Sequence, residues 1–219
     1  MAMLKDIKTI FFDYDGTLHD SMKIYGPAFR KAFGHLVEHG FVENRQWSDN
    51  EISYWLGFSS KEMWQKFMPD LDEKIREECS KIIGSEMTAL MEEKKAVLYC
   101  GALETIKYLK NKGYHLVFLS NCGIYYRDKA RELFNLDFYF EETACSEEYR
   151  YMPKYEILEK IMNKCPREMA IVGDRIHDIE AGKINNIYTI GCRYGFGSLD
   201  ELSQADLIIS DIRELMNYL

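Results

Sequence analysis

Two carboxylates separated by one residue follow an apolar run near the start of the chain. The run Ile10–Phe12 leads to Asp13, and Tyr14 stands between Asp13 and Asp15. If the extended backbone continues past the run, both carboxylates leave it on the same side. Two negative charges held so close repel unless a cation or a shared proton relieves them. The pair therefore predicts a metal site, an acid–base pair, or both, although it also fits a solvated surface turn at Gly16.

A second pair of acids follows another apolar run in the last quarter of the chain. Val172-Gly173 leads to Asp174, and Asp178 stands four residues later. If a helix begins between the two acids, their carboxylates lie on one face of it. Acids at a helix start are also common capping residues. Oxygen ligands of this kind favour Mg²⁺ as the metal.

Three further residues stand where they could hold a phosphate group. Ser120 offers a hydroxyl, and the backbone N–H groups around Asn121 would face an anion if a helix starts there. Lys154 follows Pro153 at the start of an expected helix, where a cation opposes the helix dipole and needs an anionic partner. Taken singly, these residues also fit a turn, a cap and a solvated lysine.

The elements that position these groups alternate between strands and helices. Buried strands are expected at residues 10–12, 116–119, 169–172, 187–190 and 207–209, with helices at 101–109, 126–134, 155–164 and 176–186. Residues 138–140 form a short apolar stretch ahead of the polar segment 141–151. This alternation predicts an α/β fold, a Rossmann-like parallel sheet core with helices on both faces. Ligands of such sheets bind at the carboxyl ends of the strands.

Residues 19–95 show only helical patterns. Four helices are expected: along the apolar stripe from Ile24 to Val37, after a cap at Ser48 or Asp49, after the capping pattern of Ser59 and Glu62, and over residues 72–91. Their aromatic and methionine side chains are interpreted as core. Because the segment follows the first acidic loop, we expect an inserted all-α domain, residues 19–95, at the mouth of a catalytic core formed by residues 1–18 and 96–219.

Composition narrows the class of protein. The chain has 219 residues, 47% of them hydrophobic, and a net charge of −8 without a basic block, which argues against nucleic acid and anionic membranes as partners. No apolar run reaches the about 18 residues that a membrane-spanning helix needs, and the N-terminus lacks the pattern of a signal peptide. We therefore expect a cytoplasmic protein. The six cysteines stand at least 20 residues apart without a CxxC pair or Cys/His cluster, which predicts neither a zinc site nor a redox motif.

The order of the motifs resembles a known family. DYDGTL, then Ser-Asn, then Lys, then GDRIHD, each after an expected strand, is similar to the four motifs of the haloacid dehalogenase-like (HAD) phosphohydrolases, closest to phosphoglycolate-phosphatase-like members with a helical cap. The resemblance covers essentially the whole chain. It implies that Asp13 is the nucleophile and that Asp15 is the general acid and then base.

The resemblance also implies the binding groups. Ser120 and Lys154 match the groups that hold the phosphate, with Asn121 beside them, and Asp174 matches the acidic magnesium ligand with Asp178 in support. The full set expected around Mg²⁺ is Asp13, Asp15, Asp174 and Asp178.

Three positions bear on how far the resemblance extends. Met152-Pro153 stands where relatives often carry Lys-Pro, so the lysine is taken from Lys154, with Lys160 as the next candidate. Cys100 precedes Gly101 where many relatives carry proline. Lys61 matches a place where sugar-phosphate-acting relatives carry a basic residue that contacts substrate, and it also fits a solvated surface lysine.

The predicted function is that of a Mg²⁺-dependent phosphatase that hydrolyses a small phosphate monoester through an aspartyl-phosphate. The partner is a small phosphorylated metabolite such as phosphoglycolate, a nucleotide or a sugar phosphate. Two alternatives stay open: a phosphomutase of the same family, and a catalytically silent relative that binds a phosphorylated ligand. The sequence leaves open whether the protein is a monomer or a weak dimer.

Overall fold

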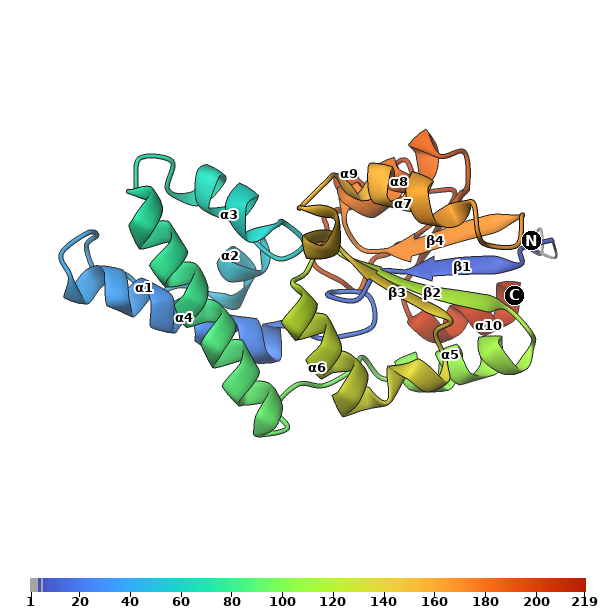
Figure 1. Ribbon diagram of the computed structural model, residues 1–219, viewed down its shortest axis with the longest axis horizontal. Coiled ribbons are helices and arrows are strands. Elements are labelled where there is room, and N and C mark those ends of the chain that lie inside the picture. The colour runs from blue at the N-terminus through green and yellow to red at the C-terminus, as the bar shows by residue number, and fades with distance from the viewer. Residues whose placement is uncertain (1–3, 5) are drawn as a thin grey trace. The chain divides into compact units, whose positions relative to one another are not determined.

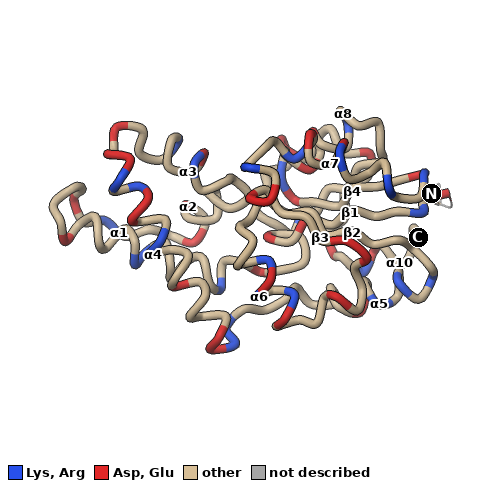
Figure 2. The backbone as a smooth tube through the Cα atoms, viewed as in Figure 1, with Lys and Arg blue, Asp and Glu red and all other residues tan. Residues whose placement is uncertain are grey.

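The structure, a computed structural model, describes residue 4 and residues 6–219 and divides the chain into two compact units (Figure 1). The core unit combines Met1–Asp20 with Leu98–Leu219, and the helical unit is Ser21–Val97. The helical unit is thus a single segment inserted between the two parts of the core unit. Its boundaries stand beside the expected ones, 18/19 and 95/96. Acidic and basic residues are interspersed along both units (Figure 2).

The core unit is built on a parallel sheet of six strands, in the order β3-β2-β1-β4-β5-β6. The strands are β1 (Thr9–Phe12), β2 (His115–Ser120), β3 (Glu142–Cys145), β4 (Met169–Gly173), β5 (Tyr188–Cys192) and β6 (Leu207–Ile209). All residues of β1 and β4 are buried, as expected of central parallel strands covered on both faces. The expected α/β class and parallel sheet are confirmed.

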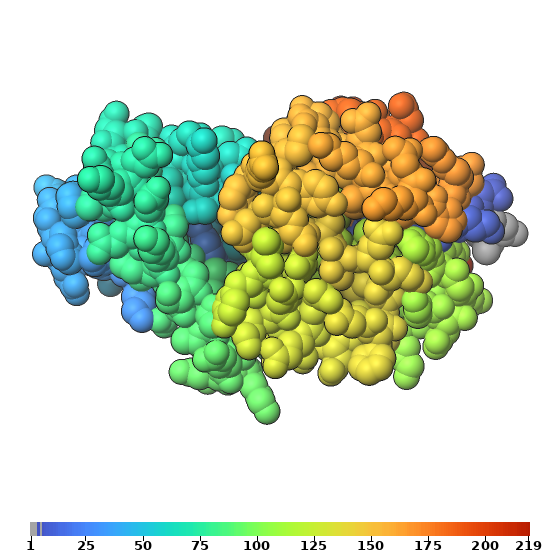
Figure 3. All heavy atoms as spheres, in the orientation of Figure 1, coloured from blue at the N-terminus to red at the C-terminus, as the bar shows by residue number. Residues whose placement is uncertain are grey.

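Helices cover both faces of this sheet (Figure 1). The helices of the core unit are α5 (Ala102–Asn111), α6 (Ile124–Phe134), α7 (Lys154–Met162), α8 (Ile176–Ile184), α9 (Leu199–Leu202) and α10 (Leu215–Tyr218), with 3₁₀ turns η1 (Leu136–Phe138), η2 (Ser146–Tyr149) and η3 (Ile212–Glu214). Phe11, Val117 and Ile171 of the sheet pack with Leu158 of α7 in one buried cluster. Atoms of the segment from α6 to α8, yellow-green to orange in Figure 3, cover the core unit on the side in view.

The strand order changes direction between β1 and β4. From β1 the chain builds outward through β2 to β3, then returns to place β4 on the other side of β1 and continues to β6. Phe12, the last residue of β1, pairs with Phe118 of β2 and with Val172 of β4. β4 ends one residue later, at Gly173, and β2 two residues later, at Ser120, so the three strands end close to one another. Helical connections on opposite faces leave a crevice at such a point, which is where doubly wound sheets bind ligands.

One strand lies where the sequence showed only a polar segment. β3 (Glu142–Cys145) falls inside residues 141–151, whereas the apolar stretch before it lies at the end of η1, where Phe138 is 76% exposed. β3 is an edge strand, so Glu142 and Thr143 remain partly exposed and only Ala144 and Cys145 are buried. A half-exposed edge strand lacks the continuous apolar pattern that identifies central strands.

The helical unit contains the four expected helices. They are α1 (Met22–Glu38), α2 (Asp49–Ser53), α3 (Ser60–Phe67) and α4 (Glu73–Glu92). The predicted caps are confirmed, since Ser48 caps α2 and Ser59 caps α3, each in a capping box with the glutamate three residues later. Phe29 lies against Trp47 and Phe67, with ring centroids 5.4 and 5.5 Å apart, which confirms an aromatic core.

Candidate active site

Asp13 directly follows strand β1, at the carboxyl end of the sheet. The Asp13 N–H donates to the Val172 carbonyl at 2.9 Å, which extends the sheet pairing by one residue before the chain turns. The Tyr14 carbonyl then accepts from the N–H groups of Thr17, Leu18 and His19. The turn needs a left-handed residue, and Gly16 supplies it with φ of 81°.

Three carboxylates from two strand ends meet around Asp13. Oxygen atoms of Asp13, Asp174 and Asp178 all lie within 4.8 Å of one another, and all three residues are buried. Asp174 follows β4, and Asp178 lies in the first turn of α8. The structure therefore brings together three of the four acids that the sequence predicted around a metal.

Lys154 is the cation of this cluster. Its Nζ donates to Asp13 Oδ1 at 2.8 Å and to Asp178 Oδ1 at 2.6 Å, and the side chain is buried. The lysine is the first residue of α7, which places its ammonium beside acids from β1 and α8. Lys160, the other candidate, is exposed on the same helix.

Burial and like charges make this cluster electrostatically costly. Burial, followed by the charge of Asp178, raises the pKa of Asp13 to about 7. Burial also raises the pKa of Asp174 well above its ordinary range, with the Asp13 and Asp178 charges adding to the effect. Burial alone would lower the pKa of Lys154, but the carboxylates of Asp13 and Asp178 raise it above its usual value. One ammonium, bonded to two of the acids, thus accompanies three carboxyl groups, and the site favours a further cation.

A loop that the sequence analysis did not single out holds Asp174. The Phe196 N–H donates to Asp174 Oδ2 at 2.6 Å, and the Thr17 hydroxyl lies 3.4 Å from Oδ1. A Cβ on Gly195 would lie 2.3 Å from the Asp174 Cβ, and one on Gly197 only 1.9 Å from the Asp174 carbonyl oxygen. The Gly-Phe-Gly sequence just beyond β5 was the available signal, because it is a glycine-rich loop at another strand end.

Asp15 lies apart from the three-acid cluster. Its Oδ1 accepts from the Tyr126 hydroxyl at 2.8 Å and lies 3.4 Å from His19 Nδ1, which is 3.1 Å from that hydroxyl. The Tyr14 ring stacks on His19 with centroids 4.9 Å apart. The side chain of Asp15 therefore lies in a hydrogen-bonded group with Tyr126 and His19 and outside the group of possible metal ligands.

Tyr126 and His19 are functional candidates that sequence reasoning missed. Tyr126 stands 111 residues from Asp15, so no local pattern connects them. His19, four residues from Asp15, gave only a weak signal. Burial, with the Asp15 charge next, raises the pKa of Tyr126 well above its ordinary value, so the hydroxyl stays a donor toward Asp15.

The remaining predicted residues occupy different settings. Ser120 ends β2 and is buried. Helix α6 begins at Ile124, slightly before the expected start at residue 126, and Gly123 is its N-cap. The Ile124 N–H donates to a Glu147 carboxylate at 2.7 Å, and Asn121 lies between the end of β2 and this helix. Lys61 is exposed on α3 in the helical unit.

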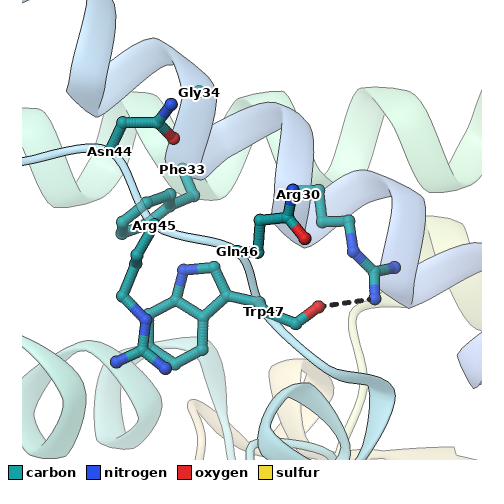
Figure 4. Close-up of a pocket in the computed structure, with 7 residues that line it drawn as sticks. All are labelled: Arg30, Phe33, Gly34, Asn44, Arg45, Gln46 and Trp47. Atoms are coloured by element: carbon teal, nitrogen blue, oxygen red, sulfur yellow. Dashed lines mark hydrogen bonds between the residues drawn. The ribbon is translucent and has the colours of Figure 1, made fainter.

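The helical unit also has a surface pocket of its own. The pocket has a volume of about 330 Å³, and its lining side chains are drawn in Figure 4. The Arg45 guanidinium lies 3.6 Å from the Trp47 ring centroid, and Arg30 donates to the Trp47 carbonyl. Its lining comes from α1 and the segment after it and includes no candidate residue named above.

The donor set of the acid cluster fits a hard divalent cation. Mg²⁺ is bound in proteins by carboxylate oxygens together with water or substrate phosphate. Asp13, Asp174 and Asp178 offer only carboxylate oxygens and are close enough to share an ion. The excess of buried negative charge is of the kind that a bound cation relieves.

Comparison with known proteins identifies the family. Residues 10–192 match the family model of the haloacid dehalogenase-like hydrolases. The chain belongs to this family. This match confirms the resemblance that the order of the motifs indicated. It includes residues of the core unit of this haloacid dehalogenase-like hydrolase and the whole inserted helical unit.

Named members of the family resemble this hydrolase over nearly its full length. It is 30% identical to phosphoglycolate phosphatase of Aquifex aeolicus, covering 89% of this chain and 88% of the relative, and 29% identical to glyceraldehyde 3-phosphate phosphatase of Pyrococcus furiosus, covering 99% and 94%. The crystal structure of a predicted phosphatase from Clostridium acetobutylicum shares the fold, with a TM-score of 0.83 at 23% identity over 96% of this chain and 97% of that one. Among the described residues of the hydrolase, no helix combines the length and apolar character needed to span a bilayer.

Proposed function

We propose that this hydrolase is a Mg²⁺-dependent phosphatase that cleaves a small phosphate monoester through an aspartyl-phosphate on Asp13. The observation that carries the proposal is the buried cluster of Asp13, Asp174 and Asp178 with Lys154 bridging two of its acids. Such a cluster is costly for stability, and its position at the direction change of the sheet is the expected one for a ligand site.

In the first step the Asp13 carboxylate attacks phosphorus, so that an Asp13 O–P bond forms and the bond to the leaving oxygen breaks. A phosphate monoester is a dianion, and its approach to a carboxylate is opposed by charge repulsion. Lys154 offsets part of that repulsion from 2.8 Å away, and bound Mg²⁺ would neutralise developing charge on the phosphoryl oxygens. Ser120, at the neighbouring strand end, supplies a hydroxyl donor for a phosphate oxygen.

Asp15 moves the protons. Its carboxyl group protonates the leaving oxygen, which departs as an alcohol. In the second step Asp15 takes a proton from water, whose oxygen attacks phosphorus, so that the Asp13 O–P bond breaks and inorganic phosphate leaves. Tyr126 fixes the orientation of the Asp15 carboxyl group by donating to Oδ1.

The substrate is proposed to be a small phosphorylated metabolite. The two curated relatives named above are phosphatases of phosphoglycolate and of glyceraldehyde 3-phosphate, both short-chain phosphate esters. The helical unit is proposed to act as a cap that excludes bulk water during the reaction, with Lys61 contacting the substrate away from the transferred group. All six cysteines are free thiols, which fits the reducing cytoplasm.

Phosphate release from a panel of esters tests the proposal. The panel contains phosphoglycolate, glyceraldehyde 3-phosphate, nucleoside monophosphates and sugar phosphates, each assayed with Mg²⁺ and with a chelator. We expect release from at least one short-chain ester in Mg²⁺ and none in chelator. Isomerisation of a sugar phosphate without release would identify a phosphomutase, and no turnover of any ester would favour a binding protein.

The variant Asp13→Asn tests the nucleophile. An amide neither attacks phosphorus nor carries the negative charge of a ligand, so turnover is expected to disappear while the circular dichroism spectrum stays unchanged. Retention of more than about a tenth of the wild-type rate by a folded variant would reject Asp13 as the nucleophile, because loss of an activated nucleophile costs several powers of ten in rate.

A further inference from the structure

A second cluster of metal-binding side chains lies at the amino ends of the strands. Atoms of His115, Glu142 and Cys165 that can ligate a metal all lie within 4.8 Å of one another. We propose that these three residues form a site for a transition metal ion of the Zn²⁺ type, separate from the active site. The proposal does not depend on the phosphatase chemistry.

The sheet register explains how residues so far apart in sequence meet. His115 opens β2 and lies on the same face as Val117, two residues on. Val117 pairs with Glu142, the first residue of the neighbouring strand β3, so both point to that face as well. Cys165, just beyond α7, belongs to the same buried cluster as Val117. The three side chains therefore converge at one edge of one face.

The donor types differ from those of the active site. The active site offers only carboxylates, which suit Mg²⁺. Imidazole, thiolate and carboxylate together suit Zn²⁺ and similar first-row ions, and three protein ligands leave a fourth tetrahedral position for water or another ligand.

The orientation of His115 supports a ligand role. Its Nδ1 lies 3.9 Å from a carboxylate oxygen of Glu141, whereas Nε2 is buried and has no hydrogen-bond partner among residue 4 and residues 6–219. A buried ring nitrogen left unsatisfied is destabilising. Metal-bound histidines commonly direct their second nitrogen toward a carboxylate, which holds the ring in place. A metal on Nε2 would remove the cost, and Nδ1 would remain on the side of the Glu141 carboxylate, at 3.9 Å and so beyond hydrogen-bond distance.

Cys165 is a buried thiol close to His115 and Glu142. Its Sγ donates a long hydrogen bond, 3.7 Å, to the Ile161 carbonyl. Burial, with the Glu142 charge next, raises the pKa of Cys165 to about 11, so the metal-free side chain is a neutral thiol. Metal binding would release the Sγ proton to solvent and form the thiolate ligand.

The two clusters stand at opposite ends of the sheet. β2 starts with His115 at the amino end and finishes with Ser120 at the active site. Five residues of extended chain span about 16 Å. A metal at His115 would therefore be too far from the Asp13 carboxylate to share ligands with it.

Cobalt titration of the full-length protein tests the site. Co²⁺ can replace Zn²⁺ and shows a thiolate-to-metal charge-transfer band only when a sulfur atom is bound. Co²⁺ bound by the carboxylates of the acid cluster therefore gives no such band, and saturating Mg²⁺ in the buffer does not affect the band. We expect one equivalent of Co²⁺ to produce the band in wild type and in the control Cys100→Ala, whose cysteine is exposed. Cys165→Ala is expected to remove it. Absence of the band in wild type, or its persistence in Cys165→Ala, would overturn the proposal.

Zn²⁺ affinity provides a second measurement if Cys165→Ala fails to fold. Glu142 is partly exposed, so Glu142→Gln leaves the core intact. Competition with a chromophoric chelator is expected to show at least about tenfold weaker Zn²⁺ binding for Glu142→Gln. Loss of a residue that only hydrogen-bonds a metal ligand already weakens metal binding about tenfold, so loss of a ligand should have at least that effect. Phosphate release in Mg²⁺ is expected to stay unchanged. Equal Zn²⁺ affinity in Glu142→Gln and wild type would reject the site.

Discussion

At the scale of single residues, Lys154 is the group on which the active-site charges depend. It is buried, and it is the cation bonded to both Asp13 and Asp178. Arg175, although adjacent to Asp174 in sequence, forms its ion pair with Glu201. Removing the lysine therefore takes a charged hydrogen-bond donor away from two buried carboxylates, although Asp178 Oδ2 still accepts from the Arg175 N–H at 3.0 Å.

Lys154→Ala is expected to affect both turnover and stability. Loss of a charge-assisted contact should cost about 2 kcal/mol or more of transition-state stabilisation, or about thirtyfold in kcat/KM. Loss of one partner from a buried ion pair should also lower the free energy of unfolding by about 3–5 kcal/mol. Lys160→Ala, on the exposed face of the same helix, is the matched control. If Lys160→Ala lost the activity and Lys154→Ala kept it, the phosphate role would belong to Lys160.

Tyr126→Phe tests how Asp15 is positioned. The change removes the hydroxyl that donates to Asp15 Oδ1 and keeps the ring, so it should lower kcat about tenfold with a smaller effect on KM. The loss should be larger for alkyl phosphates than for p-nitrophenyl phosphate, whose leaving group needs little protonation. Tyr125→Phe, which alters an exposed neighbour, should have no effect. Equal losses with both esters would indicate a structural role for the hydroxyl.

At the scale of elements, loops and not regular structure determine how close the acids lie. The backbone of Gly16, in the turn after β1, and that of Gly195 and Gly197, in the loop after β5, lie directly against Asp174. A side chain at these positions would occupy the volume of the carboxylate itself. The sheet brings the strand ends together, and the glycines permit the final approach.

Gly16→Ala tests this close approach against a matched control. A Cβ on Gly16 would lie 2.2 Å from Asp174 Oδ2, whereas one on Gly113 would meet no atom of the described residues within 4 Å. The two glycines have similar φ values of 81° and 87°. Both alanine variants should lose about 1–2 kcal/mol of folding free energy from the left-handed backbone. Gly16→Ala alone should also lose at least about tenfold in kcat, because a small displacement of a catalytic group has a large effect on rate.

Thermal unfolding and phosphate release measure the two effects separately. If Gly16→Ala matched Gly113→Ala in both stability and activity, the contact between Gly16 and Asp174 would have no functional weight.

At the scale of the whole molecule, the candidate site residues are distributed over two units. All members of the acid cluster, Lys154 and the Asp15 network belong to the core unit. The helical unit supplies Lys61, which stands exposed in the first turn of α3 after the Ser59 cap. We therefore expect the chemistry to be encoded in one unit and the choice of substrate partly in the other.

Lys61→Ala tests that division. If Lys61 contacts the part of the substrate remote from the phosphoryl group, the variant should raise KM or lower kcat for the preferred metabolite and leave p-nitrophenyl phosphate hydrolysis nearly unchanged. Lys81→Ala, an exposed lysine on α4, is the control. Equal effects on both substrates, or none on either, would show that Lys61 is a solvated surface residue.

The sequence by itself determined the features that depend on neighbouring residues. Central strands are buried on both faces and so appear as continuous apolar runs, and the acids that end them, such as Asp13 and Asp174, follow directly in the chain. Capping of α2 by Ser48 and of α3 by Ser59 is equally local. These patterns predicted the parallel α/β core, the four inserted helices and the family.

Only the tertiary structure decided which distant groups meet. Lys154 and Asp13 stand 141 residues apart, and Tyr126 and Asp15 stand 111 apart, so their contacts follow from strand order and register. The edge strand β3 was not predicted, because its partial exposure removes the continuous apolar pattern. The residues that lie beside Glu142 could therefore not be predicted either. Cysteine spacing gave no sign of a metal site, because His115 and Cys165 come together only when β2 and the end of α7 pack on the same face of the sheet.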